Sequence, residues 1–529
     1  MGVATFLSRI LGLVREQVYA HFMGDTPVAS AFKLAFQIPN LFRRLLGEGA
    51  LTAAFVPIFK EKEQTEGEEG MWHSANAVMA ALILACSVVV FLAIVGITVI
   101  LTVTSLKFHQ GQSVVNPPFP IPFLSPETRL MLQLLRMMFP YLILVCMAAL
   151  CMGMLNARGQ FFVPALGASL LNVVMIASVL WLAPRFGVTM ETQIFALAVG
   201  VLLAGTVQFG FQIPALRKLG FRFRWVSPWK DETVRIVIRR MAPAALGVAA
   251  FQLNVLIIQS VGYAIDKSIV ASFDYAVRLM EFPQGIVGVS LSTYLLSSLS
   301  GMAAEKNYDG FRSNLRQGLG YLVFINVVAG VLLFVLAVPI VRLLFERGAF
   351  TPASTARAAA AVAALAPGLV CFSLVNTLAR AFFALGDTQT PMKISLACLA
   401  LNLLVAMWLI GPFRQAGLGM ANTASSCLNT LLLCYALKRK LPKFEFKALL
   451  PVAVSSAGAG VVAGVVAWLM AGWLDARMGH AGLGSRATIV FVPLLSGGLI
   501  YLGMAMWLRI PQAREMLDLV LGRFRRKKA

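Results

Sequence analysis

The chain has 529 residues, of which 59% are hydrophobic and 13% are charged, and its mean hydropathy is +0.80. Soluble domains carry charge on about a quarter of their residues, so this composition excludes a soluble globular protein and indicates an integral membrane protein. The net charge of +22 does not point to a nucleic-acid partner, because the basic residues lie in short loops between apolar runs.

The apolar runs predict the elements of the fold. A helix needs about 20 mainly apolar residues to cross a bilayer. The runs therefore predict an all-α polytopic membrane protein with about fourteen transmembrane helices, of which the second, eighth and tenth are interrupted by charged residues. In chain order the predicted spans are 3–22, 28–59, 75–104, 129–155, 161–184, 192–214, 236–263, 268–302, 315–343, 355–384, 392–411, 416–437, 448–474 and 486–508.

The connections between these runs predict the orientation. The loop after the sixth run reads "RKLGFRFRWVSPWKDETVRIVIRR", the loop after the twelfth reads "KRKLPKFEFK", and the tail reads "GRFRRKKA". Cytoplasmic loops of membrane proteins are enriched in Lys and Arg, so both termini are predicted to be cytoplasmic. The acidic connection "KEKEQTEGEEG" after the second run does not change this, because Asp and Glu contribute little to the rule.

Motifs for enzyme chemistry and metal binding are missing from the sequence. The seven cysteines all lie inside apolar runs without CxxC spacing, and the four histidines form no HExxH pattern. No catalytic residue, metal or cofactor is expected, and the chain is predicted not to be an enzyme. No cleavable signal peptide is expected either, because Arg9 and Arg15 interrupt the first apolar run.

Two pairs of segments repeat along the chain. "NARGQFFVP" at 156–164 is similar to "FALGDTQTP" at 383–391, and "AFKLAFQI" at 31–38 is similar to "SFDYAVRL" at 272–279. Repeats in the same order are typical of duplicated transporters. The predicted parts are an N-terminal lobe at 1–220, a C-terminal lobe at 221–440, and two extra helices with a basic cytoplasmic tail at 441–529.

Several predicted spans carry ionisable residues, which cost about 2.5–3.5 kcal/mol each at the centre of a membrane helix. One interpretation is local pairing with a carboxylate, or snorkelling of the side chain to the head groups. The other is a cationic cavity, which the excess of cations over carboxylates favours, and the planar fork of arginine suits phosphate. The residues concerned are Arg9 and Arg15 in the first run, Arg43, Arg44 and Glu48 in the second, and Arg278 and Glu281 in the eighth.

Proline and glycine interrupt the same helices. They are tolerated in membrane helices where the released carbonyl groups face protein or water. Ordinary helix packing is the alternative interpretation. Pro39 and Gly49 in the second run, and Pro283 and Gly285 in the eighth, are predicted as hinge positions.

Three strings carry a family resemblance: "SRILGLVREQ", "FKLAFQIPNLFRRLLGEGALTAAFVPIF" and "YAVRLMEFPQGIVGVSLST". The chain resembles the MurJ/MviN family of bacterial lipid II flippases, in the MATE-like (MOP) superfamily. The resemblance implies alternating-access transport of lipid II across the inner membrane, with lipid II and membrane lipids as partners and cell-wall synthesis enzymes as further candidates. It implies substrate binding by Arg9, Arg15, Arg43 and Arg278, and supporting cavity roles for Asn40, Arg44, Glu48 and Glu281.

Alternatives and departures stand beside this resemblance. A flippase for another polyprenyl-linked glycan, a drug antiporter and a non-transporting cell-wall scaffold are the alternatives. Ser30 stands where the family often has Asp, and Gln37 where it often has Lys. No intramembrane acid is expected near Gln252, Asn254 and Asn376, so a sodium site is not expected.

Overall fold

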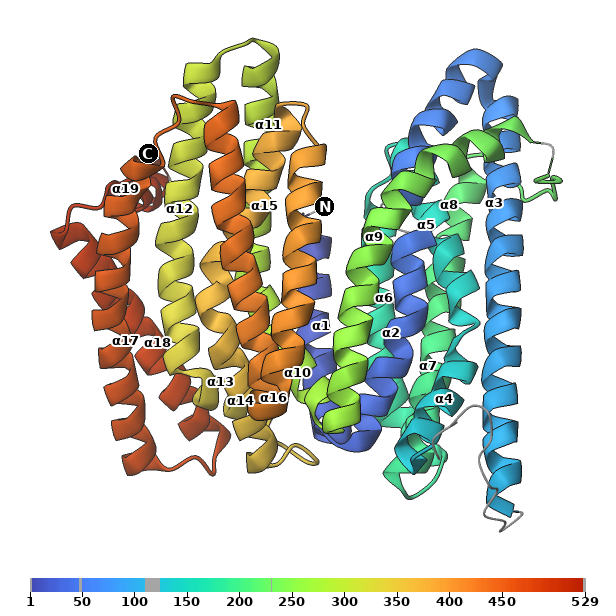
Figure 1. The fold of residues 1–529 in the computed structure, drawn as a ribbon, viewed down its shortest axis with the longest axis horizontal. Helices are drawn as coiled ribbons and strands as arrows, with labels where there is room; N and C mark the ends of the chain where they lie inside the picture. The colour runs from blue at the N-terminus through green and yellow to red at the C-terminus, as the bar shows by residue number, and fades with distance from the viewer. Residues whose placement is uncertain (1, 47–49, 110–123, 230, 527–529) are drawn as a thin grey trace. The chain divides into compact units, whose positions relative to one another are not determined.

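The computed structural model describes residues 2–46, 50–109, 124–229 and 231–526, and it contains helices but no strand within those ranges. The predicted all-α class is therefore confirmed. The chain divides into two compact units, residues 1–271 and 272–529, which are described separately (Figure 1).

The first unit contains nine α-helices among its described residues. A π-helical turn and a 3₁₀ turn, Ser178–Leu182 and Ala183–Arg185, extend its sixth helix. The helices are α1 (Gly2–Met23), α2 (Pro27–Leu46), α3 (Ala50–His109), α4 (Pro126–Met138), α5 (Tyr141–Ala157), α6 (Phe162–Ala177), α7 (Met190–Gly210), α8 (Ile213–Lys218) and α9 (Glu232–Ile265).

The second unit begins within the first turn of α10. A π-helical turn at Gln284–Gly288 separates its first two helices. The helices are α10 (Ile269–Pro283), α11 (Val289–Ala304), α12 (Tyr308–Val335), α13 (Ala337–Phe345), α14 (Pro352–Leu365), α15 (Leu369–Ala384), α16 (Gln389–Lys440), α17 (Leu450–Met478), α18 (Leu483–Trp507) and α19 (Pro511–Arg526), with 3₁₀ turns at Ala366–Gly368 and Phe446–Leu449.

Eight helical segments of the described chain are long and apolar enough to span a membrane, or nine if α4 and α5 form one bent span. These segments confirm a multi-pass membrane protein. Charged residues interrupt α1 and α2, and α10 has only 15 residues, so these helices are not among the candidate spans and the count of about fourteen remains a prediction. The 45° bend between α4 and α5 lies at Phe139 and Pro140, where proline lacks an amide donor for the helix.

The acidic connection after the second predicted span differs from expectation. Residues 50–109 form one helical run that is broken only at Gly67, whose φ is 71°. The segment stays helical because Glu and Lys have high helix propensity and Lys62 pairs with Glu66 one turn later. The end of the predicted second span therefore belongs to α3.

Helix α9 packs on α2 within the first unit. Ala31 and Leu34 of α2 form a buried apolar cluster with Tyr263 of α9 and Val270 of α10. The side-chain hydroxyl of Ser30 accepts a hydrogen bond of 3.1 Å from the backbone amide of Ala271. These contacts extend the compact unit to residue 271, whereas the predicted lobe boundary lies at residue 220; the lobe assignment remains a prediction.

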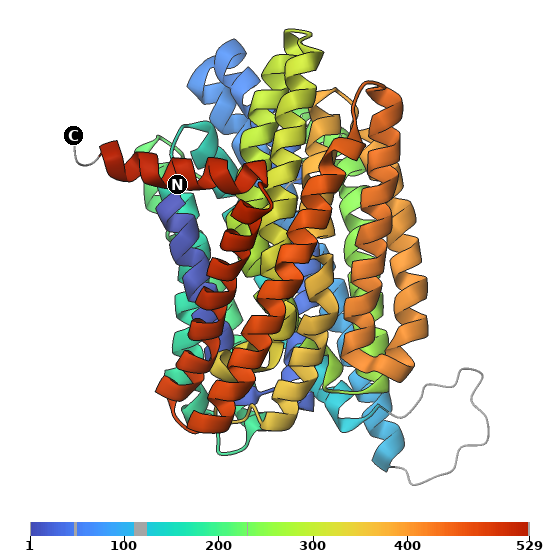
Figure 2. The same ribbon diagram turned by 90° about the vertical axis from the view of Figure 1, so that its left-hand side faces the viewer.

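Helices α17 and α18 lie side by side in both views (Figures 1 and 2). Their close approach depends on small residues, because a Cβ on Gly497 of α18 would lie 3.3 Å from Ala467 Cβ of α17. A Cβ on Gly464 of α17 would lie still closer, 2.5 Å from Val331 Cγ1 of α12. The described part of the predicted basic tail belongs to α19, which follows the end of α18 and lies crosswise to it in Figure 2.

An ionic network fixes the turn between α17 and α18 on α13. Arg486 donates to the backbone carbonyl of Glu346 at 2.7 Å and lies 3.3 Å from its carboxylate. Arg342 lies 3.6 Å from both Glu346 and Asp475. The network joins the last two long helices to the rest of the second unit.

Candidate functional site

A buried carboxylate joins α1 and α2. Glu16 is 2% exposed, and its two oxygens lie 2.6 Å from Arg15 and 3.4 Å from Lys33. The Arg15 guanidinium also stands 5.5 Å from the ring centroid of Tyr19, which meets Phe32 edge to face. Two cations from two helices thus contact one carboxylate.

Arg9 lies on a different face of α1 from Arg15. Six residues of α-helix correspond to a rotation of about 240°, which leaves the two side chains about 120° apart. Beside Arg9, the carbonyl of Ser8 accepts a 3.2 Å hydrogen bond from Asn172 of α6, and Gly12 faces the same amide. The Ser8 and Gly12 face therefore packs on α6. Arg9 is half-buried, and no ion pair joins it to another described residue.

The Pro-Asn segment of α2 positions the next arginine. Arg43 Nε donates to Asn40 Oδ1 at 2.6 Å, so the amide orients the guanidinium one turn along the helix. Pro39 is buried inside α2, and Arg44 is exposed. The predicted supporting residue Glu48 and the predicted hinge Gly49 lie outside the described residues.

In the second unit, α10 carries the remaining predicted site residues. Arg278 Nη1 lies 2.9 Å from Glu281 Oε2, and both side chains are largely exposed, at 41% and 54%. Pro283 ends α10, and Gly285 lies in the π-helical turn that follows. Such turns are frequent at functional sites in membrane and soluble helices.

The structure brings some of the predicted residues together. Arg15 pairs locally with Glu16, and Arg278 pairs locally with Glu281, as the pairing interpretation expected. Convergence of Arg278 with Arg9 and Arg43 on one cavity stays a prediction, because these residues belong to separately described units.

Sequence reasoning did not include Lys33 and Arg380 among the site residues. Lys33 completes the Glu16 cluster, and Arg380 of α15 donates to Thr293 Oγ1 of α11 at 2.6 Å. Both were visible as ionisable residues inside predicted spans, which is the general signal for function in membrane helices. The sequence pattern did not show the partner of either residue, because each contact joins two different helices.

The three residues considered as sodium ligands lie in α9 and α15. Gln252 and Asn254 of α9 are buried at 6% and 7% exposure. Asn376 of α15 donates to the carbonyl of Phe372 at 3.1 Å. Its amide therefore bonds within its own helix.

The sequence of this chain is similar to sequences of a known family. The family profile described as "Lipid II flippase MurJ" matches residues 19–480. A "Lipid II flippase MurJ" of Burkholderia cenocepacia is 31% identical over 510 residues, covering 94% of this chain and 95% of that protein.

Two solved structures show the same fold. One is described as "Lipid II flippase MurJ, inward closed conformation", with a TM-score of 0.77, 23% identity, and coverage of 96% of this chain and 98% of that one. The other is an inward-facing multidrug resistance MATE family transporter of the MOP superfamily, with a TM-score of 0.63, 13% identity, and coverage of 83% and 96%. With the profile spanning residues 19–480 and a relative aligned over nearly the whole length of both chains, this chain belongs to the MurJ family of lipid II flippases.

Proposed function

We propose that this chain moves lipid II, an undecaprenyl-diphosphate-linked disaccharide-pentapeptide, across the bacterial inner membrane by alternating access. The observation that carries the proposal is the match of residues 19–480 to the flippase family. The multi-pass helical fold supports it, since alternating access needs two helical bundles that move against each other.

The arginines would bind the diphosphate. Arg9, Arg15, Arg43 and Arg278 are the proposed substrate-binding residues. Their guanidinium groups offer two parallel donors to phosphate oxygens, which lysine cannot reproduce. In the α1–α2 cluster, the contacts with Glu16 hold Arg15 and Lys33 together, so two cationic groups lie close to each other.

Supporting roles follow from the local contacts. Asn40 orients Arg43 through the 2.6 Å hydrogen bond, and Glu281 holds Arg278 in place until substrate arrives. Arg44 would add positive charge at the exposed side of α2. Such oriented groups lower the entropy lost when a ligand binds.

The lobe movement would bend the helices at proline and glycine. Pro283 and Gly285 flank the junction of α10 with the π-helical turn, where the regular hydrogen-bond ladder already changes. Pro39 would act in the same way within α2. Rocking of the lobes 1–220 and 221–440 would expose the arginines alternately to the two sides of the membrane.

The last two long helices would hold the polyprenyl tail. Val465, Trp468 and Leu469 of α17 and Leu499 of α18 are large apolar side chains that remain exposed in the second unit. Within a bilayer, such a surface offers an apolar groove to a lipid tail. The anionic head would cross between the lobes while the tail stays in the membrane.

Orientation and partners complete the proposal. Both termini would be cytoplasmic, because the connection after α7 is rich in Lys and Arg. The chain would be a non-catalytic transporter that works without a cofactor. Lipid II and membrane lipids would be its ligands, and cell-wall synthesis enzymes its protein partners.

Substitution of Arg278 tests the proposal in cells. The gene is expressed as the only lipid II flippase, and growth is measured at matched protein levels. Arg278→Ala is expected to abolish growth, and Arg278→Lys to restore it weakly, because lysine lacks the bidentate fork. Arg316→Ala is the control, since Arg316 is an exposed arginine of α12 outside the proposed site. Full growth with Arg278→Ala would remove Arg278 from the mechanism.

A further inference from the structure

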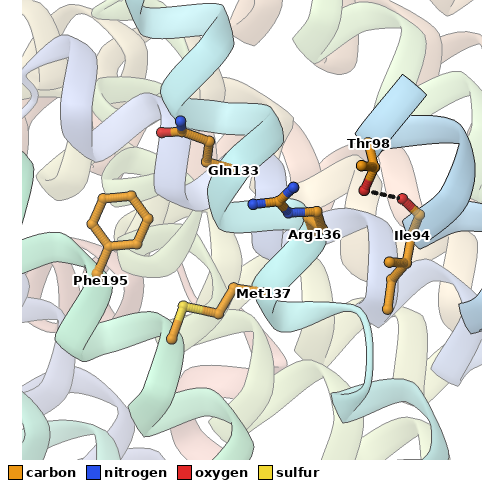
Figure 3. A pocket seen from close by; sticks show the side chains of 6 residues that line it. All are labelled: Ile94, Thr98, Gln133, Arg136, Met137 and Phe195. Atoms are coloured by element: carbon orange, nitrogen blue, oxygen red, sulfur yellow. Dashed lines mark hydrogen bonds between the residues drawn. The ribbon is translucent and has the colours of Figure 1, made fainter. Parts of the chain in front are cut away.

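A pocket of about 560 Å³ lies in the first unit, and none of its lining residues is among those proposed to bind lipid II (Figure 3). Three helices form it, and its volume is within the range of about 300–1,000 Å³ that small-molecule sites occupy. Its lining side chains are Ile94 and Thr98 of α3, Gln133, Arg136 and Met137 of α4, and Phe195 of α7.

Helix α4 supplies the polar wall of this pocket. Gln133, Arg136 and Met137 are spaced i, i+3 and i+4, so they share one face of the helix. Arg136 lies ten residues after Pro126, which corresponds to about 15 Å along the bent α4–α5 span. The Arg136 side chain is exposed, and in a bilayer that this span enters at Pro126 it would lie at membrane depth, where a cation needs a polar partner.

Within the protein, the pocket offers no anion to this guanidinium. None of the lining residues is acidic, and the Thr98 hydroxyl already donates to the carbonyl of Ile94 at 2.7 Å. Glu191 stands one turn before Phe195 on α7 but forms no ion pair with Arg136 among the described residues. The pocket thus combines a positive charge with an apolar wall.

Apolar side chains of α3 next to the pocket lining are exposed. Val95 and Val99, the neighbours of two lining residues, are 43% and 54% exposed, and Phe91 is 66% exposed. In a bilayer these side chains face lipid. A ligand that enters from this side must therefore be an amphiphile, with an anionic group for Arg136 and a hydrocarbon chain for the apolar wall.

We propose that this pocket binds a membrane phospholipid. The phosphodiester would accept hydrogen bonds from the Arg136 guanidinium and from the Gln133 amide, and one acyl chain would lie against Ile94, Met137 and Phe195. Phospholipid is the occupant because it surrounds the opening and carries both groups that the pocket selects. The lining shares no residue with the proposed diphosphate site, and the proposal does not depend on that site.

Photo-crosslinking of the full chain tests this site. Phe195 is replaced by benzoylphenylalanine, the protein is irradiated in cell membranes, and the attached lipid is identified by mass spectrometry. Trp181, which is 69% exposed and outside the pocket, receives the same replacement as a control for lipid that merely surrounds the protein. A phospholipid adduct is expected at Phe195 at a higher yield than at Trp181.

Charge substitutions then define the recognition. Arg136→Gln is expected to lower the Phe195 adduct at least about tenfold, because a charge-assisted hydrogen bond to phosphate is lost. Arg136→Lys should retain part of the adduct yield at Phe195. This variant provides the measurement if Arg136→Gln does not fold. Arg185→Gln, on an exposed arginine outside the pocket, should change nothing.

Three outcomes would overturn the proposal. Equal yields at Phe195 and Trp181 would mean that the pocket has no selective occupant. An unchanged yield in both Arg136 variants would mean that the guanidinium does not hold the phosphate. A polyprenyl-diphosphate adduct at Phe195 would assign the pocket to the substrate pathway instead.

Discussion

The carboxylate of Glu16 is predicted to hold α1 and α2 together. Its side chain is 3% exposed and contacts Arg15 at 2.6 Å and Lys33 at 3.4 Å. Glu16→Gln keeps the size of the side chain and removes its charge. Removing one partner of a buried ion pair costs about 3–5 kcal/mol, and the remaining amide oxygen places this change near the lower end.

Thermal unfolding measures this effect. A thiol-reactive fluorescent dye reports the exposure of Cys146 and Cys151, which are buried in α5. For a unit of this size, a loss of about 3 kcal/mol lowers the melting temperature by roughly 6–12 °C. Glu61→Gln is the matched control, because Glu61 is exposed. If Glu16→Gln melts within the error of this control, the carboxylate does not bind the two cations as described.

Two further predictions concern the loop after α15 and the packing of α7. Lys440 lies 2.7 Å from Asp387, and this contact and the amide of Thr390 hold the pKa of the Asp387 carboxyl below its usual range. The ionised carboxylate therefore stabilises the fold at neutral pH, and this contribution is lost as the pH falls below about 4. Asp387→Asn should therefore lower the free energy of unfolding by about 0.5–1 kcal/mol at pH 7, and the difference from the parent protein should shrink in acid. A difference between parent and variant that does not change with pH would refute the assignment. Gly205→Ala places a Cβ 2.8 Å from the buried ring of Tyr141 and should destabilise the protein by about 1–3 kcal/mol, whereas Gly210→Ala meets open space; equal melting temperatures would contradict this packing.

The fold was predictable where one physical signal dominates a segment. Uninterrupted apolar length was enough for α18, since no other structure satisfies the backbone in a bilayer, whereas the predicted span 315–343 is divided between α12 and α13. It was not enough for residues 60–70, whose charges suggested a connection. There, helix propensity and the pairing of Lys62 with Glu66 maintain the helix, and Gly67 alone breaks it.

The contacts of the candidate site were likewise predictable only in part. The contacts of Arg43 with Asn40 and of Arg278 with Glu281 follow from helical spacing, because both pairs are three residues apart. The contact between Glu16 and Lys33 joins two helices and depends on their relative rotation, which sequence periodicity does not specify. The pocket around Arg136 needs three helices at once, so only the packed structure reveals it.

Direct measurement of lipid II translocation tests the central claim. The purified chain is reconstituted into vesicles that contain lipid II with a fluorescent head group, and a membrane-impermeant reductant quenches the label on the outer leaflet. We predict that the parent protein brings the inner-leaflet pool to the outside, and that Arg278→Ala leaves this pool protected. A parent protein that is correctly inserted but leaves the inner pool protected, or an Arg278→Ala variant that exposes it as fast as the parent, would contradict the account.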